Sequence, residues 1–342
     1  MEQSRLLTLT QHGFYCPVGD FYVDPWHPVP RALVTHAHSD HCVWGCESYL
    51  VAAEGEPVFR VRLGADAAIQ TVRYGEPTTI NGVQVSFHPA GHILGSAQIR
   101  LEYRGEVLVV SGDYKLEPDA TCARFETVRC HHFISEATFG LPIYHWQSSE
   151  RVFEQINAWW AANAESGKAS ILYCYTLGKA QRIIAAADPS IGAILTHGAV
   201  ERLNAAYRAA GVTLPPTQYA LTADKSLYRH ALIIAPVSAR GTSWVRRFGA
   251  HASGFASGWM RIRGARRQRA VDRGFILSDH ADWEGLHSAI GSTGAAQIGV
   301  THGYVPVLTR WLNEQGVDAY GIDTRYRGEG DDAPEAGEEG DS

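Results

Sequence analysis

His36-Ala37-His38-Ser39-Asp40-His41 places four side chains that can bind metal within six residues. The apolar run Ala32-Leu33-Val34-Thr35 comes directly before it and is typical of a buried strand. Packing gains nothing from so many imidazoles and carboxylates in one place. Neutral histidine nitrogens suit zinc, and a carboxylate offsets the charge of the ion. The stretch therefore predicts a site for two adjacent cations where a strand ends.

The same order, an apolar run followed by a polar or metal-binding residue, repeats along the chain. It recurs before His92, Asp113, Glu136, His280 and His302. Short apolar runs bounded by turn residues predict buried strands, and α/β proteins collect their sites beyond the carboxyl ends of such strands. We therefore expect these side chains to gather where several strands end.

The middle of the chain has a different pattern. Residues 151–164 show the apolar stripe of a helix, and strand-like runs follow at 171–175, 193–196 and 231–235. Alternating strands and helices predict a parallel sheet. Because this part lies between two segments of the first pattern, we expect an inserted domain at 142–271, with the first domain made of 1–141 and 272–328.

Charge and composition set limits on the protein class. The net charge is −6, but residues 329–342 hold seven acidic residues and no basic one. Without them, 30 basic residues face 29 acidic ones, and the charge is about +1. This tail of Gly and acidic residues is expected to be disordered. No apolar stretch is long enough to cross a bilayer, and the six cysteines form no CxxC pair. We expect reduced thiols in a cytoplasmic protein with no membrane partner.

An arginine-rich segment predicts the substrate. Residues 246–273 contain eight arginines and one acid, with Trp259 interleaved and Trp244 just before. Arginine binds phosphate in a bidentate manner, and aromatic faces stack on unpaired bases. This pattern favours nucleic acid, and a solvated basic face is the alternative. The contact residues that we expect are Ser238 and Arg240, from a loop suited to a terminal phosphate, and Trp259, Arg261, Arg263, Arg266 and Arg267.

The motifs together resemble the metallo-β-lactamase superfamily and, within it, the β-CASP nucleases that cut DNA or RNA. Asp24 matches the first acidic motif, residues 36–41 the second, His92 in Gly91-His92-Ile93-Leu94-Gly95-Ser96 the third, and Asp113 the fourth. Glu136, His280 and His302 resemble the three later motifs that mark the β-CASP branch. A narrower likeness, to bacterial DNA ligase-associated exonucleases, is carried by segments 14–17, 24–26, 257–264 and 277–283. The resemblance covers about residues 6 to 328.

The resemblance implies an α/β fold, namely an αββα sandwich with an inserted β-CASP domain that has a parallel sheet. It implies two Zn²⁺ ions, with Mn²⁺ as the alternative. His36, His38 and His92 would hold one ion, Asp40, His41 and His302 the other, and Asp113 would bridge them. Asp24 would orient a ligand imidazole, although a turn aspartate before Pro25 is the alternative.

The sequence offers two candidates, His197 and His302, for the last histidine ligand. Thr196-His197-Gly198 repeats the local sequence of Thr301-His302-Gly303. His302 lies in the resumed first domain, 22 positions after His280, whereas His197 lies in the inserted part. We therefore expect His302 to be the ligand and His197 to be structural or close to the substrate.

The chemistry expected at such a site is phosphodiester hydrolysis. A hydroxide between the two ions would attack phosphorus, with His280 as general acid and Glu136 orienting it. The resemblance implies a DNA exonuclease in DNA repair that is associated with a DNA ligase and a helicase. A ribonuclease of the same branch is the alternative, because RNA-cleaving members usually carry His at the position of His302. A non-nucleolytic metallohydrolase and a catalytically dead binding subunit are the remaining readings.

Overall fold

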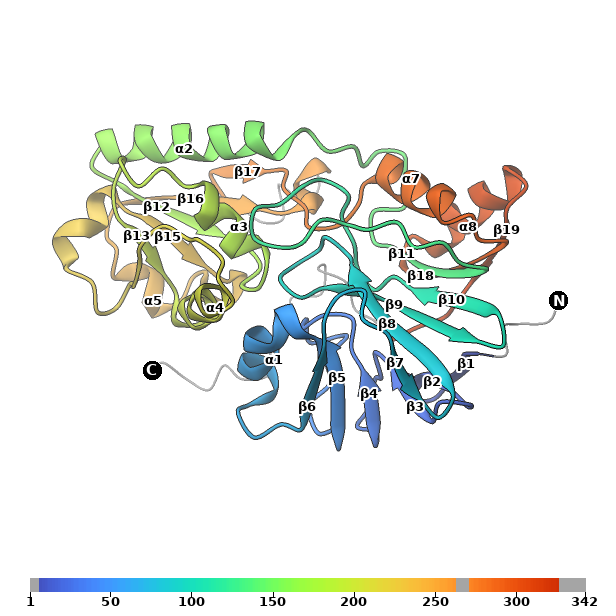
Figure 1. Cartoon of the computed structure of the whole chain (residues 1–342). Helices are drawn as coiled ribbons and strands as arrows, with labels where there is room; N and C mark the ends of the chain where they lie inside the picture. The colour runs from blue at the N-terminus through green and yellow to red at the C-terminus, as the bar shows by residue number, and fades with distance from the viewer. Residues whose placement is uncertain (1–5, 263–270, 326–342) are drawn as a thin grey trace. The chain divides into compact units, whose positions relative to one another are not determined.

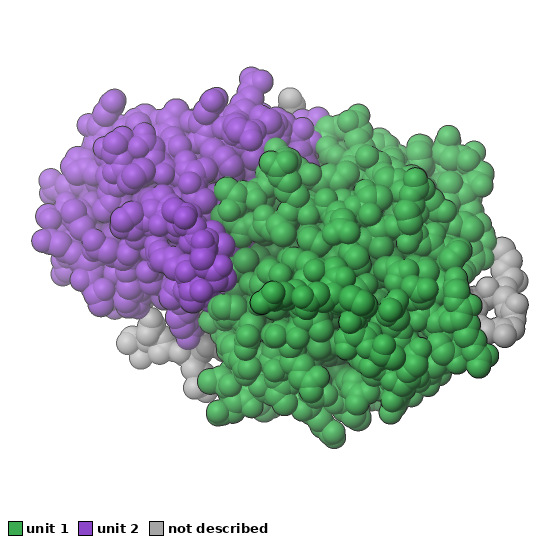
Figure 2. Space-filling view, in the orientation of Figure 1, with its two compact units in different colours: residues 1–145, 280–328 green, residues 146–279, 329–342 purple. Residues whose placement is uncertain are grey.

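The computed structural model describes residues 6–262 and 271–325. The chain forms two compact units (Figure 2). Unit 1 comprises Met1–His145 and His280–Gly328, and unit 2 comprises Trp146–Asp279 and Glu329–Ser342. The predicted disordered tail, 329–342, lies outside the described residues. None of the helices within 6–262 and 271–325 is both long enough and apolar enough to span a bilayer.

Unit 1 contains two sheets. In the first sheet, β1 to β3 are antiparallel and β3 to β6 are parallel. Its strands, in spatial order, are β1 (Thr8–Thr10), β2 (Gly13–Cys16), β3 (Phe21–Val23), β4 (Arg31–Leu33), β5 (Ser48–Ala52) and β6 (Ile69–Val72). A 3-10 turn, η1 (Ala53–Gly55), and helix α1 (Glu56–Leu63) connect β5 to β6.

The second sheet of unit 1 has seven strands. Its antiparallel half, β7 to β10, continues into a parallel half in which β11 lies between β10 and β18. Its strands, in spatial order, are β19 (Asp318–Gly321), β18 (Gln297–Gly303), β11 (His132–Ala137), β10 (Glu106–Val110), β9 (Ala97–Tyr103), β8 (Val83–Pro89) and β7 (Thr78–Ile80).

Strand β10 shows why the apolar runs in the sequence are continuous. Leu108 and Val110 point into a core shared with the first sheet, which includes Phe21 and Phe87. The alternate residues of β10 belong to a second core together with Leu286 of α7 (Trp283–Thr293) and residues of α8 (Val305–Glu314). A strand that is buried on both faces needs apolar residues at every position. The two sheets thus pack face to face, and α7 and α8 cover the outer face of the second (Figure 1).

Unit 2 is built on one six-stranded sheet in which all strand pairs are parallel (Figure 1). Its strands, in spatial order, are β14 (Thr217–Tyr219), β13 (Ile194–Thr196), β15 (Leu232–Ala235), β12 (Ala169–Tyr173), β16 (His251–Ala256) and β17 (Arg273–Phe275). The helices among its described residues are α2 (Ser149–Glu165), α3 (Lys179–Ala186), α4 (Gly198–Ala209) and α5 (Ser243–Arg246), with 3-10 turns η2 (Lys225–His230), η3 (Val237–Ala239) and η4 (Gly258–Arg261). The expected α/β class, with a parallel sheet in the inserted part, is confirmed.

The boundaries between the two units in the sequence differ from the domain bounds that were expected. The structure divides the chain after His145 and after Asp279, whereas 141 and 271 were expected. On the C-terminal side the reason is β17, which pairs with β16 and so extends the sheet of unit 2. The apolar run 274–277 therefore belongs to unit 2, and His280 begins the return to unit 1.

Candidate metal centre

Six segments of unit 1 bring buried imidazole and carboxylate groups to one place. They form three overlapping groups, within each of which the ligand atoms lie no more than 4.8 Å apart. The groups are His36, His38, His92 and Asp113; His41, Asp113 and His302; and Asp113, Glu136 and His280. Asp113 belongs to all three groups and is therefore the centre of the cluster.

The Asp113 carboxylate faces histidines from both sides. Its Oδ2 atom lies 3.5 Å from Nε2 of His36 and 3.6 Å from Nε2 of His41, and its Oδ1 atom lies 3.0 Å from Nε2 of His302. Burial acts to raise the pKa of Asp113, but His302, His41 and His280 outweigh it and hold the pKa well below its usual range. The carboxylate is thus ionised and central, as a group that bridges two cations must be.

A close backbone approach brings Asp113 to His36. Gly112 has φ +57°, and a Cβ atom added to it would lie 2.6 Å from Oγ1 of Thr35. Only glycine lets the segment after β10 lie this close to the segment after β4. The backbone N–H of Ala97 also donates to the carbonyl of Thr35 at 2.8 Å. The approach of Gly112 to Thr35 thus brings together the two strand ends that carry the central carboxylate and the histidine stretch, and the start of β9 holds Thr35 in addition.

Asp24 and Thr35 form hydrogen bonds that hold the histidine stretch in place. The Asp24 side chain, 1% exposed, accepts three hydrogen bonds: from Thr35 N at 2.7 Å, Thr35 Oγ1 at 2.6 Å and His41 Nδ1 at 2.7 Å. Because Nδ1 of His41 faces this carboxylate, Nε2 is the nitrogen that faces Asp113. Sequence reasoning selected Asp24 but missed Thr35, since a threonine that ends an apolar run carries no signal of its own.

The pKa values of His36 and His41 indicate whether the cluster is suited to bind cations. Burial and the neighbouring imidazoles lower the pKa of His36 well below 6.5, so its ring is neutral. Its Nε2 atom has no hydrogen-bond partner among the described residues. Burial also acts to lower the pKa of His41, but Asp113, Asp40 and Asp24 raise it to about 10. The three carboxylates near His41 favour positive charge at this place. Imidazoles around an ionised carboxylate are typical ligands of divalent metal cations.

A β-bulge places His302 in the cluster. Along β11 and β18, Glu136 pairs with Thr301 and Ala137 pairs with Gly303, so His302 is the extra residue between two regular pairs. A bulge redirects a side chain away from the strict alternation of a strand. His302 is 7% exposed and reaches Asp113, even though it lies within a strand.

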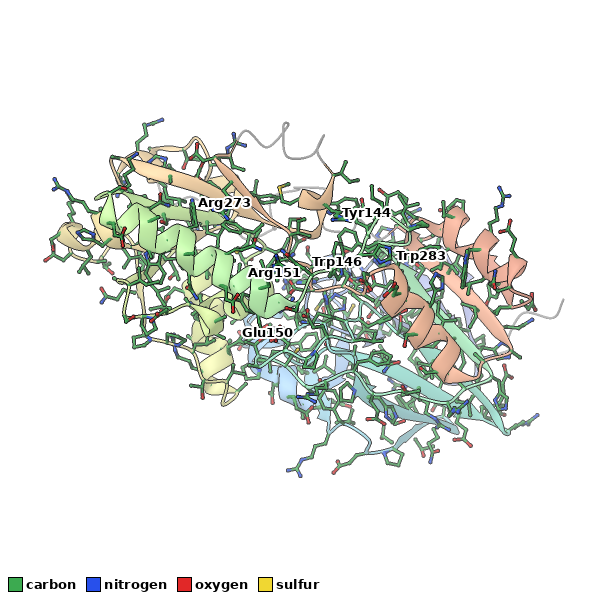
Figure 3. The ribbon with its side chains drawn as sticks, turned by 90° about the horizontal axis from the view of Figure 1, so that it is seen from above. Tyr144, Trp146, Glu150, Arg151, Arg273 and Trp283 are labelled. Carbon is green, nitrogen blue, oxygen red and sulfur yellow. The ribbon has the colours of Figure 1, made fainter. Side chains whose placement is uncertain are left out.

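Glu136 and His280 form the third group of the cluster. Nδ1 of His280 donates to Oε2 of Glu136 at 2.9 Å, and the backbone N–H of Tyr114 donates to Oε1 of Glu136 at 2.7 Å. Two backbone contacts hold the segment that follows His280. Ala281 N donates to the Tyr114 carbonyl at 2.7 Å, and Trp283 N donates to the Tyr144 carbonyl at 3.1 Å, at the start of α7 (Figure 3). The imidazole is therefore fixed in both position and orientation.

Two residues considered from the sequence lie outside the three groups. Asp40 is half-buried at the edge of the cluster, where its Oδ2 atom lies 3.9 Å from Nε2 of His41. His197 lies in unit 2 at the start of α4, where Nδ1 accepts a hydrogen bond from Ala199 N and the ring packs edge-on against Trp244 at 5.0 Å. The structure thus gives His197 a capping role and places His302 in the cluster.

The four expected nucleic-acid contacts among the described residues belong to unit 2. Ser238 and Arg240 are exposed at η3, directly after β15. Trp259, half-buried, and Arg261, exposed, lie in η4 after β16. Both turns follow strands that flank β12, so they lie at the same edge of the sheet of unit 2. The remaining three, Arg263, Arg266 and Arg267, lie outside the described residues.

Comparisons with known proteins identify relatives over most of the chain. No family model matches it. A "Probable DNA ligase" from Opitutus terrae is 30% identical over 314 residues, which are 91% of this chain and 30% of that protein. An "Endoribonuclease YSH1" from Eremothecium gossypii is 29% identical over 35% of this chain and 16% of that protein. A "Cleavage and polyadenylation specificity factor subunit 3" from Dictyostelium discoideum is also 29% identical over 35% of this chain. The chain thus spans less than a third of the length of the first two relatives.

A solved structure shares the fold. The crystal structure of a protein of unknown function from Enterococcus faecalis V583 aligns with a TM-score of 0.60 over 86% of this chain and 79% of that one. The two sequences are 11% identical, so the likeness concerns the fold alone.

Proposed function

The chain belongs to the β-CASP branch of the metallo-β-lactamase superfamily, and on that premise we propose that it is a two-zinc phosphodiesterase acting as a DNA exonuclease in DNA repair. The observation that carries this proposal is the buried cluster around Asp113. Glu136 and His280 belong to this cluster, and Asp24 holds His41 in it. A protein that uses its fold only for binding has no need of this arrangement.

The proposal assigns the metal ligands to two sets. His36, His38 and His92 would hold one ion, and His41 and His302 would hold the other, with Asp113 shared by both sets. The first two groups of the cluster support this division, since each contains the residues of one set together with Asp113. Asp40 is included in the second set on family resemblance. Two bound cations would lower the pKa of water and neutralise charge on the phosphate oxygens.

The remaining steps belong to side chains of the protein. Glu136 accepts the Nδ1 proton of His280 and fixes its ring, which leaves Nε2 to carry a proton to the leaving oxygen. The negative charge of Glu136 also stabilises the protonated form of the imidazole. Asp24 orients His41 so that its Nε2 faces Asp113 and would be available to a metal ion, and partners of this kind commonly strengthen metal binding.

DNA is favoured as the substrate by the relative that covers most of this chain. That protein is named as a probable DNA ligase, and 91% of this chain aligns with it. The alignment of this chain with 30% of a protein that is named as a probable DNA ligase supports a role for this protein beside a DNA ligase. Arg240, Arg261, Ser238 and Trp259 are the described residues that we propose to contact the strand, at one edge of the sheet of unit 2.

A ribonuclease of the same branch is the second candidate, because several relatives are named as endoribonucleases. Digestion of DNA and RNA strands of identical sequence, each labelled at one end, separates the two. We expect stepwise removal of nucleotides from DNA in the presence of Mn²⁺ or Zn²⁺, with products bearing a 5′-phosphate. Faster cleavage of RNA would establish the ribonuclease, and intact strands of both kinds would refute the proposal.

A further inference from the structure

Thr138 has a buried hydroxyl group that makes no hydrogen bond among the described residues. The residue is 1% exposed, and its Oγ1 atom has no hydrogen-bond partner among the described residues. Leaving a buried hydroxyl unpaired is unfavourable, and such groups are rare in folded proteins. Valine has nearly the same shape and would avoid this cost. A threonine at this position therefore needs an explanation outside the packing of unit 1.

The position of Thr138 is close to the metal centre. It follows Ala137, the last residue of β11, and comes two residues after Glu136. The Ala137 carbonyl accepts a hydrogen bond from Tyr304 N at 2.8 Å. A Cβ atom on Gly303 would lie 2.5 Å from Cα of Thr138, so the glycine after His302 lets the two segments touch.

The next residue, Phe139, contacts His280 of the metal centre. The ring of Phe139 lies edge-on to the ring of His280, with 5.9 Å between centroids. Thr138 is thus held between the segment that carries His302 and the residue that packs on His280. The backbone of Thr138 is therefore adjacent both to the segment that carries His302 and to Phe139, which packs on the proposed proton donor.

We propose that the Thr138 hydroxyl binds substrate by donating a hydrogen bond to a non-bridging phosphate oxygen; this rests on the function proposed above. A phosphodiester brings charged acceptor oxygens to the centre, and a hydroxyl is a donor of adjustable direction. The bond to a charged oxygen is stronger than one to a neutral group. It would form only when substrate is bound, which accounts for a donor that lacks a partner in the protein alone.

Thr138→Val tests this directly, because it keeps the shape and removes the hydroxyl. We expect kcat/KM for a DNA oligonucleotide to fall roughly ten- to a hundredfold, the effect of losing one hydrogen bond to a charged group. Metal content should remain that of the unmodified enzyme, and Tm should be equal or higher because an unpaired hydroxyl is removed. Unchanged kcat/KM would overturn the proposal. A lower Tm with unchanged kcat/KM would show in addition that the hydroxyl has a structural role.

A second pair of variants controls for packing. Thr138→Ser and Thr138→Ala both lose the methyl group, and only serine keeps the hydroxyl. We expect the serine variant to be at least fivefold more active than the alanine variant at equal metal content, on the order of one weakened hydrogen bond. Equal activity of the two would also overturn the proposal. Failure of the unmodified enzyme to cleave DNA or RNA would instead refute the proposed function, so the two failures are distinguishable.

Discussion

Nδ1 of His280 donates a hydrogen bond to Oε2 of Glu136 at 2.9 Å, although 144 positions separate the two residues in the sequence. The other oxygen of Glu136 is held by the backbone N–H of Tyr114 at 2.7 Å. The carboxylate therefore cannot turn away from the imidazole without breaking a buried hydrogen bond. This arrangement leaves Nε2 of His280 as the nitrogen for proton transfer, and it makes His280 separable from the metal ligands by experiment.

His280→Ala should slow cleavage of DNA without loss of metal. Removing a general acid typically costs about 10²- to 10⁴-fold in rate. A nitrophenyl phosphodiester has a leaving group that needs no proton, so its hydrolysis should fall far less in the same variant. Measuring kcat for both substrates, with metal content determined by mass spectrometry, checks the assignment. Equal losses on both substrates would refute the role of His280 as general acid, and substantial loss of metal would make His280 a ligand instead.

Asp113→Ala should remove the bridge and abolish cleavage. The variant leaves buried histidines around a site without its central negative charge, so we expect at most one metal ion per chain. Asp323→Ala, at an exposed position of unit 1, is the matched control and should keep full metal content and activity. Two bound ions together with near-normal turnover in Asp113→Ala would contradict the assignment.

Asp24→Asn should weaken metal binding. The substitution keeps the size of the side chain but replaces an acceptor of three hydrogen bonds by a group with one acceptor oxygen. Loss of such a partner usually lowers metal affinity about 10- to 100-fold. Competition with a chelating dye measures this. Asp20→Asn is a suitable control because Asp20 also has positive φ, 51° against 42° for Asp24, yet is exposed. Equal metal affinity in both variants would leave Asp24 as a turn residue only.

The raised pKa of His41 predicts that metal binding releases a proton. Without metal, the folded-state pKa of about 10 lies above the ordinary value of 6.5. The protonated ring therefore contributes stability that is fully present below pH 6.5 and is lost as pH rises through about 10. Tm of the metal-free protein should fall across that interval. Calorimetry at pH 8 in buffers of different ionisation enthalpy should detect about one released proton per chain on metal binding. No proton release would contradict the charge state proposed for His41.

A histidine away from the metal centre predicts acid sensitivity of the fold. The ring of His287 packs against two tryptophan rings, with 3.6 Å between ring centroids for Trp311 and 4.2 Å for Trp283. Burial lowers the pKa of His287 to about 4. The unfolded chain takes up a proton near pH 6.5 and the folded chain does not, so stability falls as pH drops from 6.5 towards 4.

His287→Phe keeps the aromatic contacts and removes the titrating group. Its Tm, measured without metal, should fall less between pH 7 and pH 4.5 than that of the unmodified protein. A parallel decline of the two proteins would show that His287 is protonated in the folded chain as well, and would contradict its lowered pKa.

Much of the candidate centre was visible in the sequence because its residues follow apolar runs. His92 and Asp113 come after β8 and β10, and the stretch 36–41 comes after β4. The density of imidazoles at residues 36–41 further distinguishes these positions from ordinary strand ends. Physical reasons of this kind do not depend on long-range contacts, so a linear pattern was sufficient to find them.

Other features required the folded chain. Thr35 supports Asp24 and Thr138 lies beside Gly303, and neither contact leaves a local sequence signal. The bulge that places His302 depends on the register between β11 and β18, which are far apart in the sequence. The position of β17 was also beyond a local pattern, because an apolar run does not specify which of two sheets it joins.

The most direct test of the account is anomalous X-ray diffraction from crystals of the protein loaded with Mn²⁺ or Zn²⁺. We predict two peaks, one bounded by His36, His38 and His92 and the other beside His41 and His302, with the Asp113 carboxylate between them. A single peak, or two peaks that Asp113 does not contact, would contradict the two-metal phosphodiesterase.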